Sequence, residues 1–204
     1  METPVKSGSI QRMSEPYFDL GPHTCSISTR SDDAQTWFDR GLMWCYGFNH
    51  EEAVRCFRRA AAADENCAMA WWGVAHASGS NYNKMYAAFA PDELREAMAT
   101  SHAATHEAMA RLAHASPKEQ ALIRAMPARY PSPAVADEED FLRRIDAYAS
   151  ALRPVYAAHG HDHDVAALFA EAMMNRTPWK LWDPVTGKPS EGANTEEVMR
   201  VLEE

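Results

Sequence analysis

Ala34-Gln35-Thr36-Trp37 and Ala68-Met69-Ala70-Trp71 are two similar tryptophan-containing stretches, and they begin 34 residues apart. In this alignment Gly41 falls opposite Ala75, so a small residue recurs at the same place in both units. A period of this length is typical of a repeated helix–turn–helix unit. The repeat therefore predicts a stack of helical hairpins and favours a function in which a ligand binds in a groove.

The composition of the chain favours helices, because its aliphatic residues are mainly Leu, Ala and Met rather than Val and Ile. Its 204 residues suffice for one domain or a short stack of repeats. A formal net charge of −9 argues against non-specific binding to nucleic acids and against docking on anionic membranes. No apolar run is long enough to predict a transmembrane helix.

The first 20 residues are polar, contain Pro4 and Pro16, and lack the apolar centre of a signal peptide, which predicts a cytoplasmic protein. The chain has four cysteines and no C-x-x-C pair among them. We expect Cys45, Cys56 and Cys67 to be reduced, buried thiols rather than zinc ligands.

Three segments are expected along the chain. Residues 1–30 form an extended N-terminal arm, residues 31–182 form a helical repeat domain, and residues 183–204 form a Gly/Pro-rich loop and a short C-terminal helix. Ser31 and Asn49 are expected to cap helices, and Ser116-Pro117-Lys118-Glu119 has the residues of a capping box with proline at the first helical position. About eight helices and no strand are predicted, which makes the chain all-α.

Residues 34–67 resemble a tetratricopeptide repeat (TPR). The residues that fall on the signature positions of this repeat are Trp37, Gly41, Trp44, Ala53, Phe57 and Ala60. Glu65 stands where the repeat usually has proline, and Arg40 stands where it usually has leucine. The resemblance implies antiparallel helical hairpins stacked as a short, irregular α-solenoid, in which small residues let the paired helices approach closely.

Four further stretches resemble a narrower group of bacterial and fungal TPR-containing proteins. They are residues 46–53, 68–73, 79–83 and 170–175, with Pro178-Trp179 following. Members of this group are generally longer, and their biochemical role is poorly defined. The chain thus resembles the N-terminal part of such a protein, and we expect a partner chain or self-association to cover its final repeat.

In TPR proteins the first helix of each pair lines a concave groove, so the resemblance also implies a binding surface. The residues expected along this aromatic groove, with a polar loop at its end, are Phe38, Leu42, Tyr46, Trp72, His76, Asn81, Tyr82 and Asn83. Such a groove suits a protein, a peptide or a small ligand. Alternatively, a neighbouring helix covers some of these side chains, and the asparagines serve only to form a turn.

A metal site is a second hypothesis. His50 and His76 lie at equivalent ends of the two units, Glu171 lies in an otherwise apolar segment, and His23 in the arm could fold over them. Histidines with one carboxylate suit iron, copper, zinc or manganese. A structural role competes with this hypothesis, since His50 is followed by two glutamates that the helix dipole explains.

Two other groups of histidines are weaker candidates. His102 and His106 are four residues apart on a helix and could chelate a metal ion, but their neighbours are typical of a solvated face. His159, His161 and His163 lie where a loop is expected, and exposure to solvent explains them. No arrangement of a nucleophile, histidine and acid can be inferred from the spacing.

Three functions remain open from the sequence. The preferred one is a TPR-like protein that binds a protein, peptide or small ligand in the aromatic groove. The second is a metal-dependent enzyme, possibly a redox enzyme, with His50, His76 and Glu171 in the same groove. The third is a subunit that a partner chain or another copy completes.

Overall fold

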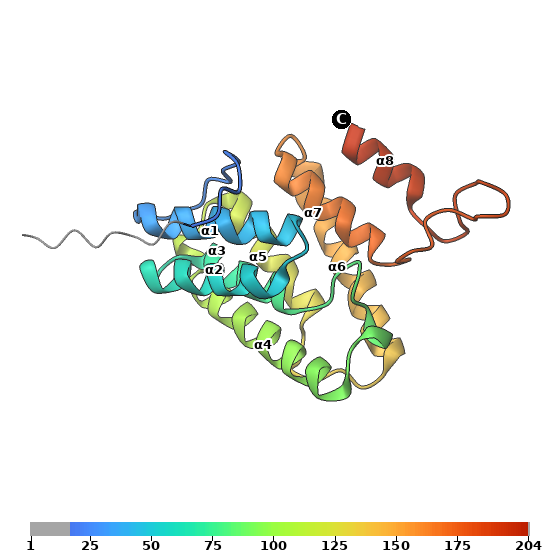
Figure 1. Cartoon of the computed structure of the whole chain (residues 1–204), viewed down its shortest axis with the longest axis horizontal. Helices are drawn as coiled ribbons and strands as arrows, with labels where there is room; N and C mark the ends of the chain where they lie inside the picture. The colour runs from blue at the N-terminus through green and yellow to red at the C-terminus, as the bar shows by residue number, and fades with distance from the viewer. Residues whose placement is uncertain (1–16, 204) are drawn as a thin grey trace, which may run out of the picture.

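The computed structural model describes residues 17–203, and this part of the chain is all-helical (Figure 1). The α-helices are α1 (Asp32–Tyr46), α2 (His50–Ala63), α3 (Ala68–Ser78), α4 (Pro91–Ala110), α5 (Pro117–Arg129), α6 (Glu138–His159), α7 (His163–Met174) and α8 (Thr195–Glu203). Two 3-10 turns, Tyr86–Ala88 and Leu112–His114, flank α4. Extended pairing in these residues is limited to two isolated bridges, so the predicted all-α class is confirmed.

The helices begin at the polar residues that the sequence suggests. The side chain of Ser31 caps α1, and Asn49 caps α2 by accepting a hydrogen bond from the Glu52 amide. Ser116 and Glu119 form the expected capping box of α5. These caps satisfy amide groups that a helix leaves without partners in its first turn.

Each α-helix packs against the next one along the chain, and α3 also contacts α1 and α5. In Figure 1, α1 and α2 lie side by side at one end, α6 and α7 lie further along the molecule, and α8 lies at the opposite edge. A continuous apolar core runs through these contacts from Phe38 in α1 to Val201 in α8. Helix α3 is central, because nearly all of its residues are buried.

Phe57 of α2 holds the first three helices together. Its ring is fully buried and lies against two glycines, Gly41 of α1 and Gly73 of α3. A methyl group added at Gly41 would lie 2.6 Å from Cε1 of Phe57, and one at Gly73 would also overlap the ring. Small residues are therefore required where these helices meet the ring.

The Cys25, Cys45, Cys56 and Cys67 thiols are free, and the last three are buried as expected. None of the helices in residues 17–203 combines the length and apolar character needed to span a membrane. Residues 17–31 contain no helix, and residues 1–16 of the expected arm lie outside the described residues. Beyond α7, residues 175–194 form a long loop that leads to α8.

We predict that Gly41→Ala lowers the free energy of unfolding by about 1–2 kcal/mol. Overpacking against the Phe57 ring should cost about 1–3 kcal/mol, and the better helix propensity of alanine should offset up to about 1 kcal/mol of it. Urea unfolding measures the change. In a Phe57→Leu background the same substitution should be neutral or stabilising, and an equal cost in both backgrounds would contradict the proposed clash.

Candidate functional site

The apolar part of the predicted groove is covered. Phe38, Leu42 and Trp72 are each 1% exposed. They line a small enclosed space together with Cys25 and Ile27 of the arm and with Val165 and Leu168 of α7. These three side chains therefore do not face an open groove, because the arm and α7 lie over them. Tyr46 is partly exposed and donates a hydrogen bond to Asp164 at 2.6 Å.

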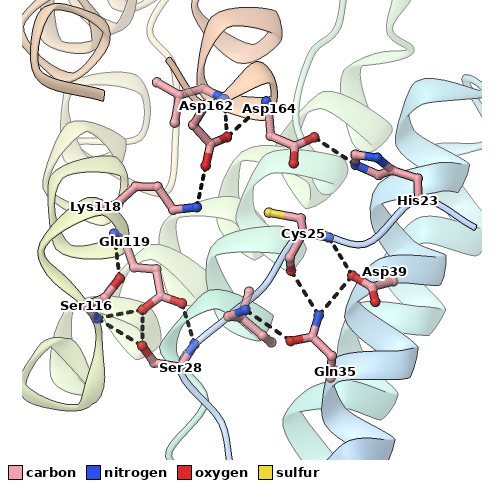
Figure 2. Close-up of polar contacts among 12 residues, drawn as sticks. His23, Cys25, Ser28, Gln35, Asp39, Ser116, Lys118, Glu119, Asp162 and Asp164 are labelled. Carbon is pink, nitrogen blue, oxygen red and sulfur yellow. Dashed lines mark hydrogen bonds and ion pairs between the residues drawn. The ribbon is translucent and has the colours of Figure 1, made fainter. Parts of the chain in front are cut away.

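Side chains of α1 hold the arm through its backbone (Figure 2). Asp39 accepts a hydrogen bond from the Cys25 amide at 3.0 Å. The Gln35 side chain donates to the Cys25 carbonyl at 2.9 Å and accepts from the Ile27 amide at 3.1 Å. These hydrogen bonds satisfy the polar backbone of an extended segment that would otherwise be buried without partners.

On the other side of the arm, Glu119 of α5 is the anchor (Figure 2). Its carboxylate is 1% exposed and accepts hydrogen bonds from the Ser28 amide at 2.6 Å and from the Ser28 hydroxyl. It also accepts from the Ser116 amide at 2.6 Å, which is the capping-box contact. One carboxylate thus caps α5 and fixes the arm, a second role that the sequence pattern did not indicate.

We predict that Glu119→Gln destabilises the protein by about 1.5–3 kcal/mol, because an uncharged amide replaces a carboxylate that accepts hydrogen bonds from buried donors. The Ser28 amide should exchange its hydrogen faster, as measured by hydrogen exchange alongside urea unfolding. Glu65→Gln, at an exposed position, is the matched control. Unchanged protection at Ser28 would show that Glu119 does not hold the arm.

A second polar group of residues lies inside the helical stack, and we call it the His76–Arg129 centre. It comprises one residue from each of five helices: His50 of α2, His76 of α3, Arg129 of α5, Tyr148 of α6 and Glu171 of α7. His76 is 7% exposed and Arg129 is 2% exposed, whereas the Glu171 side chain is 29% exposed. The centre is therefore buried and reaches solvent at Glu171.

The geometry of the centre links its members directly. The His76 ring stacks on Trp72 with centroids 5.0 Å apart, and its Nε2 lies 3.6 Å from Oε2 of Glu171. The guanidinium carbon of Arg129 lies 4.9 Å from the centroid of the Tyr148 ring. His50 interacts electrostatically with both Glu171 and Arg129.

Several nitrogen atoms in this centre are buried and have no hydrogen-bond partner among the described residues. They are both ring nitrogens of His50, Nδ1 of His76, and Nε and Nη1 of Arg129. A buried polar atom without a partner costs about 1–3 kcal/mol, and more when it is charged. Buried polar atoms without partners are few in folded proteins, so this concentration requires an explanation.

Burial controls the charge of the two histidines. The pKa of His76 is lowered to about 4, chiefly by burial; Glu171 opposes this shift, and Arg129 and His50 contribute to it. The pKa of His50 is also lowered, chiefly by burial. Both imidazoles are therefore neutral near pH 7, and each can donate one hydrogen bond and accept another.

The four expected metal ligands do not come together. His50, His76 and Glu171 belong to one centre, but His23 lies elsewhere, with its Nε2 3.1 Å from Oδ1 of Asp164. In residues 17–203, no group of three or more His, Cys, Asp or Glu side chains is placed to hold a metal ion. A positively charged Arg129 in the same centre explains why these histidines are poorly suited to a cation.

The predicted polar loop forms a turn and contacts the loop after α7, and the residue that precedes it binds Arg129. Asn81 accepts a hydrogen bond from the Asn83 amide at 3.0 Å, which is a turn-forming contact. Tyr82 accepts one from the Trp179 amide at 3.0 Å, so its hydroxyl contacts the loop after α7. The neighbouring Ser80 carbonyl accepts a hydrogen bond from Nη2 of Arg129 at 2.6 Å. The loop therefore positions Arg129, although its asparagines do not enter the centre.

The other histidines lie apart from the centre. The His102 and His106 rings are 4.5 Å apart, but Nδ1 of His102 lies 2.8 Å from the Tyr130 carbonyl oxygen and His106 is exposed. His161 and His163 are exposed and line a wide surface depression beside α8. His159, at the end of α6, is partly exposed.

Sequence reasoning missed Arg129 and Tyr148. Arg129 is the last residue of α5, where a basic side chain is ordinarily explained by the helix dipole. Tyr148 has the spacing of an ordinary core residue in α6. No local pattern distinguishes either residue, since their role depends on helices that are distant in the sequence.

Comparisons with known proteins do not extend these observations. No protein-family model matches the chain, and no curated protein or solved structure shows significant similarity to it.

We predict that the free energy of unfolding falls as the pH decreases from 6.5 towards 4. The unfolded chain takes up a proton at His76 near pH 6.5, whereas the folded protein resists protonation until about pH 4. This contribution is fully present above the unfolded pKa and amounts to at most about 3 kcal/mol. Urea unfolding at several pH values should show that the free energy of unfolding falls less steeply with decreasing pH in His76→Asn than in the wild type. The exposed His106→Asn variant should follow the wild type, and parallel curves for His76→Asn would contradict the assignment.

Proposed function

We propose that the chain is a TPR-like helical-repeat protein that binds a small ligand at the His76–Arg129 centre. The observation that carries this proposal is the convergence of polar side chains from five helices on a buried place where several nitrogen atoms lack partners. Ligand sites commonly combine an enclosed, largely apolar surrounding with a few convergent polar groups. The centre has the convergent polar groups, and it lies within the apolar core.

The proposed repeat arrangement is supported by the way the helices pack. α1 and α2 form a hairpin joined by a short turn, and each later helix packs on its predecessor. The loop between α3 and α4 interrupts the regularity, and the Ser80 carbonyl in this loop contacts Arg129. The proposed solenoid is therefore irregular at the place where it contributes to the centre.

A small ligand is favoured over a peptide because the arm and α7 already cover the apolar groove. An open groove of about 550 Å³ lies between α2, the end of α3 and α4. His50 lines this groove and also belongs to the centre. A small molecule in this groove would contact His50 of the centre without displacing the arm.

The metal-dependent enzyme is the second candidate. The 3.6 Å approach of His76 to Glu171, with both histidines neutral near pH 7, favours it. The buried charge of Arg129 disfavours it, because a divalent cation would be repelled by the guanidinium. Elemental analysis of the purified protein separates this candidate from a metal-free binding protein.

We predict that a compound that binds the centre raises the free energy of unfolding by about 2.7 kcal/mol at a concentration of 100 times its Kd. A thermal-shift screen of small anions, neutral molecules and divalent metals, followed by native mass spectrometry, would find such a compound. His76→Phe should abolish the effect, because the ring can still stack on Trp72 but has no polar nitrogen.

His106→Phe makes the same change at an exposed position and should retain the wild-type response. A compound that stabilises His76→Phe as much as the wild type binds elsewhere. If no compound stabilises the wild type through His76, the proposed ligand site is wrong.

A further inference from the structure

Arg129 carries a buried charge that has no ion pair within the described residues. Its side chain is 2% exposed, and the hydrogen bonds of the guanidinium run from Nη2 to Ser80, whose carbonyl oxygen lies at 2.6 Å and whose hydroxyl lies at 3.5 Å. Nε and Nη1 make no hydrogen bond of ordinary geometry, although the guanidinium also interacts with the Tyr148 hydroxyl. An arginine side chain remains protonated at all physiological pH values, so it cannot lose its charge to escape the cost of burial.

Glu171 is the acid of the centre, but it does not neutralise Arg129 by direct contact. The two groups interact electrostatically. The Glu171 carboxylate lies next to His76 and accepts a hydrogen bond from Asn175 at 3.3 Å. It is also partly exposed, which weakens its attraction for a buried charge. The guanidinium therefore still has N–H groups that can donate hydrogen bonds to an acceptor.

The chemistry of the free groups indicates which acceptor fits. Nε carries one N–H group and Nη1 carries two, and a guanidinium nitrogen donates but does not accept. A carboxylate offers two acceptor oxygens and matches the planar geometry of arginine. A neutral amide or alcohol would satisfy fewer of these donors and would leave the charge uncompensated.

We propose that the His76–Arg129 centre binds the carboxylate group of a small monoanionic ligand against the guanidinium of Arg129. This inference rests on the proposed ligand-binding function and specifies the chemical class of the ligand. The neutral imidazole of His50, both of whose ring nitrogens lack partners, supplies one further N–H donor in the centre, and the Tyr148 ring lies against the guanidinium.

A single negative charge fits better than two. Arg129 is the buried cation of the centre, and the negative charge of Glu171 is already present. A monocarboxylate matches the single charge of the unpaired guanidinium, whereas a phosphate dianion would add a second negative charge near Glu171, and burying an excess charge is costly. The carboxylate of an organic acid and the planar nitrate ion share the required single charge, so the experiment includes both.

The test is calorimetric titration and thermal unfolding of the full chain in chloride-free buffer at constant ionic strength. The probes are formate, acetate, propionate, nitrate, phosphate, zinc, and acetamide as the neutral analogue of acetate. Carboxylates should bind and stabilise the protein, and acetate should bind about tenfold or more tightly than acetamide. Stronger stabilisation by nitrate or phosphate than by any carboxylate would overturn the proposed ligand class.

Two substitutions assign the effect to Arg129. Arg129→Met should still fold, because an apolar side chain of similar length removes an uncompensated buried charge, and it should weaken acetate binding by about tenfold or more. Arg144→Met is the matched control, since Arg144 is 11% exposed but already pairs with Asp140 at 2.7 Å. It should bind acetate as the wild type does. Equal acetate binding by Arg129→Met and the wild type would overturn the proposal.

The outcomes also separate this inference from the proposed function. If zinc or a neutral compound stabilises the protein through His76 and no carboxylate does, the carboxylate inference is wrong and the small-ligand function stands. If no probe stabilises the wild type more than it stabilises His76→Phe, both the carboxylate inference and the small-ligand function are wrong.

Discussion

The packing of α1, α2 and α3 around the ring of Phe57 is the constraint on which the rest of the structure depends. Gly41 and Gly73 leave room for this ring, and as a result α3 is buried on nearly all sides. Later helices then stack against α3 and against one another. Because α3 also carries His76, the close packing that stabilises the stack places a polar side chain in the interior.

The buried polar groups of the His76–Arg129 centre destabilise the helical stack. Replacing buried charged groups by apolar residues often stabilises a protein, so the His76–Arg129 centre is not explained by folding alone. Its members come from five helices, and a ligand bound there would connect all of them. Ligand binding and the cohesion of the helical stack are therefore expected to be thermodynamically linked.

The candidate site was partly predictable. His50 and His76 were grouped because they lie at equivalent ends of two units, and Glu171 because it lies in an otherwise apolar segment; the three belong to one centre. His23 was grouped with them, but it pairs with Asp164 because the arm runs along α1 and α7 rather than over the centre. Arg129 gave no sequence signal, since a basic residue in the last turn of a helix is commonplace.

The sequence by itself determined the helices, their caps and the close packing of the first two, because periodic apolar residues, capping residues and small residues act within about one turn or one hairpin. Only the tertiary structure decided that the arm covers Phe38, Leu42 and Trp72 and that Arg129 and His76 interact electrostatically in one centre. Ser28 and the Glu119 that anchors it are 91 residues apart in the sequence. Contacts at such separation depend on how whole helices pack, and a local pattern of residues does not specify them.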